Sequence, residues 1–104
     1  MSKEIKFTDD AKADLQKAYE YYEGERTNLG EEFLDEVDKT VAHISSNAKM
    51  YAKFYKNVRR AILKRFPYAV LYVIRKMKVN IFAVFNTYQD PQKSIDRSEL
   101  NADK

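Results

Sequence analysis

Cysteine is absent from the 104-residue chain, and histidine, glycine and proline are scarce. Without cysteine the chain has no disulfide framework, no thiolate nucleophile and no cysteine metal site. The single histidine, His43, excludes an imidazole-based metal cluster. The two glycines, Gly24 and Gly30, cannot form a glycine-rich phosphate loop. No apolar run approaches the roughly 20 residues that a membrane span needs. We therefore expect a protein with no cofactor, no metal and no membrane segment.

Acidic residues are also missing from a long part of the chain. From Lys39 through Gln89 there are eleven Lys and Arg residues and no Asp or Glu. Residues 1–47 have a net charge of −6 and residues 48–104 a net charge of +9, which the total of +3 conceals. A surface of one sign concentrates polyanions, so this pattern indicates a nucleic-acid or acidic-protein partner. The alternative is a solvated sheet edge, on which lysines deter pairing with other strands.

The first half of the chain has mainly helical periodicity. Residues 5–7 alternate apolar and polar and predict a short strand. Thr8 is expected to cap a first helix, and Gly24 to end it. Asn28 followed by Glu31 resembles a capping box that opens a second helix, ending near residue 47. The two apolar stripes are Ala11, Leu15, Ala18 and Tyr22, then Phe33 or Leu34, Val37, Val41 and Ile44.

The second half predicts strands. Residues 53–64, 68–74 and 79–85 are rich in β-branched and aromatic residues, with a polar turn over 75–78. Residues 87–104 are polar and predict an irregular segment with at most a turn of helix near 94–100, and a flexible tail from about residue 90. The order strand, helix, helix and three strands predicts one α+β domain over residues 1–104, with the helices packed on one sheet face.

Three segments together resemble the RelE/ParE toxin superfamily. They are residues 58–68 (VRRAILKRFPY), the following strand with Tyr72, and residues 83–86 (AVFN) before Asp90-Pro91. The most specific piece is Arg-Phe-Pro-Tyr over residues 65–68, and the similarity extends over about residues 5–97. It implies a β-α-α-β-β-β fold in which a helical hairpin packs on a twisted antiparallel sheet. It also implies the toxin role of a type II, plasmid-stabilising toxin–antitoxin system, with a cognate antitoxin encoded beside it.

The resemblance implies two possible activities. RelE-like members cleave messenger RNA on the ribosome, whereas ParE-like members poison DNA gyrase. Many relatives have a His where this chain has Asn86, a basic pair where it has Tyr88 and Gln89, and a Trp where it has Ser94. These departures favour a protein that is non-catalytic or only weakly catalytic. A family member without toxicity is a third possibility. Residues 1–4 show no apolar signal region, so we expect a bacterial cytoplasmic location.

The candidate catalytic residues for RNA cleavage are Arg60, Arg65 and Tyr88. Arginine can hold a phosphate bidentately, and Tyr88 could transfer a proton if nearby cations lowered its pKa. Arg60 and Arg65 lie five residues apart, so an unbroken strand would place them on opposite faces. The alternative is that both arginines only solubilise the sheet.

A second set of residues is expected to bind nucleic acid or a protein partner. Two of its members, Tyr68 and Tyr72, share a strand face and could stack on bases, although packing in the core is the alternative. The expected partner is an antitoxin segment that docks on the basic strands by groove insertion or strand addition. The binding candidates are Lys56, Arg59, Lys64, Tyr68, Tyr72 and Asn86.

Overall fold

The computed structural model describes residues 2–101. The fold is α+β, as predicted, with three helices packed on a five-stranded sheet. In chain order the elements are β1 (Glu4–Phe7), α1 (Asp9–Glu25), α2 (Leu29–Ser46), β2 (Lys53–Tyr55), β3 (Val58–Ile62), β4 (Tyr68–Arg75), β5 (Lys78–Asn86) and α3 (Gln92–Asn101).

The two long helices begin in different ways. Thr8 caps α1 as predicted, because its Oγ1 accepts a hydrogen bond from the backbone N–H of Ala11 at 3.2 Å. The predicted capping box at Asn28 is wrong: Asn28 has a left-handed φ of 70° and its side chain caps nothing. Instead the carboxylate of Glu23 accepts hydrogen bonds from the backbone N–H groups of Asn28 and Gly30, each at 3.0 Å. The end of α1 therefore caps the start of α2 and fixes the helical hairpin.

The sheet is mixed, whereas the resemblance implied an antiparallel one. Its strand order is β1-β5-β4-β3-β2, and β1 pairs with β5 in parallel, from Glu4 opposite Lys78 to Phe7 opposite Ile81. The other neighbours are antiparallel. The single strand predicted over residues 53–64 is two strands, β2 and β3, joined by a turn at residues 56–57. Lys56 has a φ of 49° there, which ends one strand and reverses the chain.

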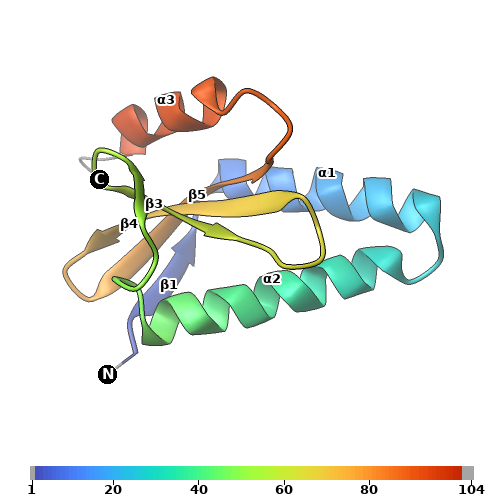
Figure 1. Ribbon diagram of the computed structural model, residues 1–104, viewed down its shortest axis with the longest axis horizontal. Helices are drawn as coiled ribbons and strands as arrows, with labels where there is room; N and C mark the ends of the chain where they lie inside the picture. The colour runs from blue at the N-terminus through green and yellow to red at the C-terminus, as the bar shows by residue number, and fades with distance from the viewer. Residues whose placement is uncertain (1, 102–104) are drawn as a thin grey trace.

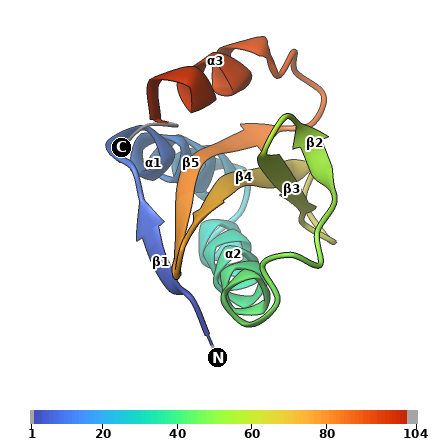
Figure 2. The ribbon, with the colours of Figure 1, turned by 90° about the vertical axis from the view of Figure 1, so that its left-hand side faces the viewer.

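The helices lie on both sides of the sheet. Helices α1 and α2 cover one face, and α3 lies on the other side of the sheet from α2 (Figure 1). The view along the sheet shows α1 and α2 as adjacent, with α3 beyond β5 (Figure 2). The main core forms under α1 and α2, where Phe33, Val37 and Ile44 meet the inward residues of β4 and β5. None of the helices described in residues 2–101 is both long and apolar enough to cross a bilayer.

The segment predicted to be irregular forms the helix α3. Asp90 precedes it, and its Oδ1 accepts a hydrogen bond from the backbone N–H of Gln92 at 3.0 Å. The first turn then closes with a bond from the N–H of Ile95 to the carbonyl of Pro91 at 2.9 Å. An acidic cap followed by proline is a helix-start signal that the sequence carries. The segment from residue 90 to residue 101 is thus mostly helical.

Candidate functional site

The three candidate catalytic residues point in different directions. The Arg60 guanidinium lies 4.5 Å from the centroid of the Phe54 ring, on the sheet face away from α2. The Arg65 guanidinium turns to α2, where its Nη2 donates to Glu32 Oε1 at 2.7 Å. Tyr88 follows the end of β5 and is 87% exposed. The structure therefore does not bring these side chains to a common point.

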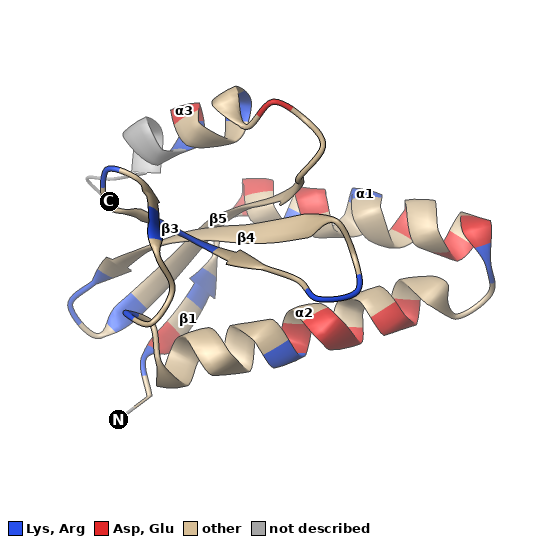
Figure 3. Ribbon diagram, in the orientation of Figure 1, with Lys and Arg blue, Asp and Glu red and all other residues tan. Residues whose placement is uncertain are grey.

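The loop between β3 and β4 is bound to α2. A carboxylate oxygen of Glu36 accepts hydrogen bonds from the backbone N–H groups of Lys64 and Arg65. The Arg65 guanidinium and, less strongly, that of Arg26 hold the pKa of Glu32 below its usual range, and Glu32 in turn raises the pKa of Arg65. Figure 3 shows this basic loop beside the acidic turns of α2. Acidic residues of the first half thus neutralise part of the acid-free stretch.

Two of the predicted binding residues stabilise the fold. Arg59 Nη1 donates to the carbonyl oxygens of Lys49 at 3.1 Å and Tyr51 at 2.6 Å, which fixes the segment before β2. Tyr72 is fully buried, and its hydroxyl donates to the carbonyl of Ala48 at 2.7 Å. Burial raises the pKa of Tyr72 to about 12. Neither side chain is available to stack on a base.

Of the other predicted binding residues, Lys64 is exposed in the loop that α2 holds, and the remaining three lie in two places. Lys56 is exposed at the turn between β2 and β3. Tyr68 and Asn86 are half-buried where β4 begins and β5 ends, and they face each other across the ladder. Burial raises the pKa of Tyr68, and Asn86 Oδ1 accepts a hydrogen bond from the backbone N–H of Tyr88 at 2.9 Å. Three predicted residues, Tyr68, Asn86 and Tyr88, therefore meet at one end of the sheet.

These three residues line a cleft of about 780 Å³ between α1, the end of β5 and α3. Tyr21 of α1 is 60% exposed and lines the cleft with them, so its walls present several aromatic rings. Neither Arg60 nor Arg65 is among the described residues of the cleft wall. Sequence reasoning missed several members because they belong to α1, to α3 or to the segment between β5 and α3. The missed members include Asp14, Lys17, Gln89, Lys93, Ser94 and Arg97.

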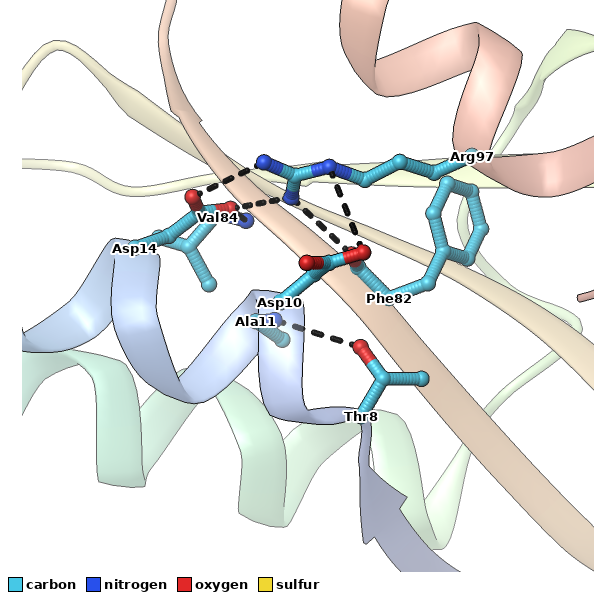
Figure 4. A network of polar contacts seen from close by, with 7 residues as sticks. All are labelled: Thr8, Asp10, Ala11, Asp14, Phe82, Val84 and Arg97. Carbon is cyan, nitrogen blue, oxygen red and sulfur yellow. Dashed lines mark hydrogen bonds and ion pairs between the residues drawn. The ribbon is translucent and has the colours of Figure 1, made fainter. Parts of the chain in front are cut away.

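An ion pair between Asp14 and Arg97 joins α3 to α1 beside this cleft (Figure 4). Arg97 Nη1 donates to Asp14 Oδ2 at 2.7 Å and Nη2 to Oδ1 at 3.2 Å, a bidentate contact. The same carboxylate accepts from the backbone N–H of Val84 at 3.0 Å, and Arg97 Nη1 also donates to the carbonyl of Phe82 at 3.2 Å. Asp14 raises the pKa of Arg97 through this hydrogen bond.

The position of this pair follows from the sheet register. Strand β1 ends at Phe7, opposite Ile81, so β1 does not pair with the last residues of β5. Asp14 and Arg97 satisfy backbone groups on that part of β5, where a further strand would otherwise bind. Within the described part of the chain, no cluster of His, Cys, Asp or Glu could hold a metal ion.

Comparison with known proteins gives a consistent family. Residues 5–91 match the family model described as "ParE toxin of type II toxin-antitoxin system, parDE". Among solved structures, a chain of the "Chromosomal ParDE TA system from P. aeruginosa" superposes with a TM-score of 0.73 at 19% sequence identity. The superposition covers 82% of this chain and 96% of that one, so it supports the fold. No curated protein sequence matches the chain.

Proposed function

Because the chain belongs to the ParE toxin family of type II toxin–antitoxin systems, we propose that it inhibits growth by binding DNA gyrase and not by cleaving RNA. The family assigns the chain the toxin role and gives it an antitoxin as partner. We propose in addition that the target is gyrase and that the protein acts in the bacterial cytoplasm.

The separation of the candidate catalytic residues supports binding over catalysis. RNA cleavage needs a base near the 2′-hydroxyl, a donor for the leaving oxygen and cations around the phosphorane, all at one place. Arg60 stacks on Phe54 on one sheet face, while Arg65 is bound to Glu32 near the other. Tyr88 lines the cleft without either arginine beside it. Many members of the superfamily that the chain resembles have a histidine at the position of Asn86. The described wall of the cleft therefore has no imidazole.

The cleft is our candidate for the antitoxin site. Its volume of about 780 Å³ lies in the range of pockets that enclose a ligand of a few side chains. Tyr21 and Tyr88 are exposed and offer apolar area with little loss of side-chain entropy. Lys17 and Lys93 provide positive charge in the wall, which also contains Asp90 and the Asp14–Arg97 pair, so its net charge is slightly positive. We therefore place an acidic antitoxin segment with an apolar anchor in this cleft, and not on the basic strands that the sequence suggested.

The target is tested with chain made by cell-free synthesis, which avoids toxicity to the host. We expect inhibition of supercoiling by purified gyrase, and no cuts in messenger RNA that is being translated on ribosomes. Arg65→Ala should leave the supercoiling result unchanged apart from lower stability. Codon-associated cuts in translated RNA that disappear in Arg65→Ala would overturn the proposal, as would gyrase activity that is unaffected at micromolar toxin.

The antitoxin site is tested separately by co-purification with the small protein encoded beside this chain. Tyr88→Ala should weaken that complex at least tenfold, because a large exposed ring in the cleft is lost. Lys12→Ala is the matched control, since Lys12 is exposed on α1 and is not part of the described cleft wall. Equal affinity of the wild type and Tyr88→Ala would place the antitoxin elsewhere.

A further inference from the structure

Two hairpin turns at the same end of the sheet each have a lysine in an unusual backbone conformation. Lys56, between β2 and β3, has a φ of 49°, and Lys76, between β4 and β5, has a φ of 54°. Strands β3 and β4 are antiparallel, so the start of β3 lies beside the end of β4. Both turns therefore project from one end of the sheet, and both lysines are exposed.

Lysine is a poor choice for these positions on conformational grounds. The left-handed region is used readily by glycine and is several-fold enriched in asparagine, because other side chains crowd the backbone there. Tight hairpin turns prefer the same two residues. A residue held in a sparsely populated region is a reason to look for function. The chain has a positive charge at two turns where asparagine would fit better.

The surroundings of these turns are strongly basic. We call Lys56, Arg75, Lys76 and Lys78 the basic end; Arg75 is half-buried and the other three are exposed. Glu4 of the adjacent strand forms an ion pair with Lys78, at 3.8 Å between exposed groups. Figure 3 shows these turns far from the acidic turns of α1 and α2. The basic end differs from the loop at residues 64–65 in its neighbours. That loop is bound to the acidic helix α2, whereas Lys56 Nζ lies 5.2 Å from the centroid of the Tyr55 ring.

We propose that the basic end binds the sugar–phosphate backbone of duplex DNA. The two turns are separated by about two strand spacings, roughly 10 Å. That is similar to the roughly 12 Å width of the DNA major groove, so each tip can meet phosphates on one side of it. Lysine provides a compact, mobile point charge that suits phosphates without selecting a sequence.

An acidic protein is the competing partner, and the shape of the basic end disfavours it. Protein interfaces need a buried apolar centre surrounded by polar residues. Here the turns project outward, and Met77 is the large apolar side chain exposed between the cations of the β4–β5 turn. The proposal does not depend on gyrase as the target, because it concerns contact with DNA alone.

The test measures binding of the full chain, made by cell-free synthesis, to a fluorescent 30-base-pair duplex at several salt concentrations. Four phosphate contacts predict a slope of log K against log salt of about −3.6, which is roughly a 150-fold loss of affinity between 50 and 200 mM salt. The double variant Lys56→Asn/Lys76→Asn should reduce the slope to about −1.8. Its Tm should rise by a few degrees, because asparagine suits both turns. The matched control is Lys12→Gln/Lys39→Gln, which removes the same charge from exposed positions on α1 and α2.

The combination of a smaller slope and a raised Tm in the turn variant, with the control unchanged, would establish the site. Absence of binding by the wild type at 50 mM salt would overturn the proposal. An equal decrease of slope in the turn variant and the control would also overturn it, since total charge would then explain binding. A polyglutamate peptide that competes as well as unlabelled duplex at equal charge would assign the basic end to an acidic protein instead.

Discussion

The two glycines of the chain give a sharp test of the packing between α1 and α2. A Cβ built on Gly30 would lie 2.7 Å from Cδ1 of Tyr19 and 2.8 Å from the Tyr19 carbonyl oxygen. The ring could turn away, but the carbonyl belongs to the backbone of α1, so the helices would have to separate. A Cβ on Gly24 would meet nothing within 4 Å. Both glycines are helical with negative φ, so they differ mainly in this contact.

Replacing each glycine by alanine should have opposite effects. Alanine in place of a helical glycine near a helix end stabilises by about 0.5 kcal/mol. Gly24→Ala should therefore raise Tm by about 2–4 °C in a domain of this size. Gly30→Ala has the same gain, but overpacking against backbone costs about 1–3 kcal/mol. The expected net loss of about 1.5 kcal/mol lowers Tm by roughly 6–12 °C.

Thermal unfolding followed by circular dichroism at 222 nm measures both variants against the wild type. Gly24→Ala is the control for helix propensity, because it has no new contact. Equal stabilisation of the two variants would refute the close approach of α1 and α2 at Gly30. Destabilisation of both variants would mean that a Cβ at Gly24 does meet other atoms, contrary to the open space found there.

Three other substitutions test buried or paired groups. Tyr72→Phe should cost about 1–2 kcal/mol by leaving the Ala48 carbonyl without its donor, as measured by urea unfolding. The wild type should also lose stability as pH rises from 10 to 12, because Tyr72 ionises earlier when unfolded, and the variant should lose less. The wild type should lose stability as pH falls below about 4.5, since the lowered pKa of Glu32 stabilises the fold only while that group is ionised. Arg65→Gln removes the main cause of the lowered pKa, so this variant should lose less stability over the same pH range. Asp14→Ala should destabilise by about 1–3 kcal/mol, since it removes acceptors from a β5 backbone N–H and an arginine.

Matched controls are present in the same elements. Tyr55→Phe removes the hydroxyl of a half-buried tyrosine on β2 and is the control for loss of a tyrosine hydroxyl in urea unfolding. Asp10→Ala removes a carboxylate that is 61% exposed and 3.9 Å from Arg97, so its effect should be a few tenths of a kcal/mol. A large loss in Asp10→Ala with none in Asp14→Ala would reverse the roles that the distances assign.

Elements with strong local signals could be predicted from the sequence. Thr8 caps α1, and the strands over residues 68–75 and 78–86 follow their apolar runs. The failures have local causes too. The Glu23 carboxylate replaces the Asn28 side chain at the start of α2, because it can reach two backbone N–H groups at once. The parallel position of β1 could not be read from four residues, since it depends on which strand edge the folded sheet leaves open.

The site was less predictable, because its contacts join distant parts of the chain. Arg65 appeared available in sequence, but its partner Glu32 lies 33 residues earlier, on a helix that folding brings beside it. The pair of Asp14 and Arg97 spans 83 residues and has no local signature. The acid-free stretch predicted a basic surface, and this is correct at the exposed turn around Lys76. It is not correct at the loop around Arg65, because Glu32 of α2 neutralises that arginine.

The parallel pairing of β1 with β5 sets a limit on when this toxin can become active during synthesis. Phe7 leaves the ribosome early, but its partner Ile81 is made 74 residues later. At about 5–20 residues per second that interval is roughly 4–15 s. Until then β1 has no partner, and the cleft lacks the end of β5 as its wall. A chain that terminates before β5 should therefore be harmless, and growth inhibition should begin only after β5 has been made.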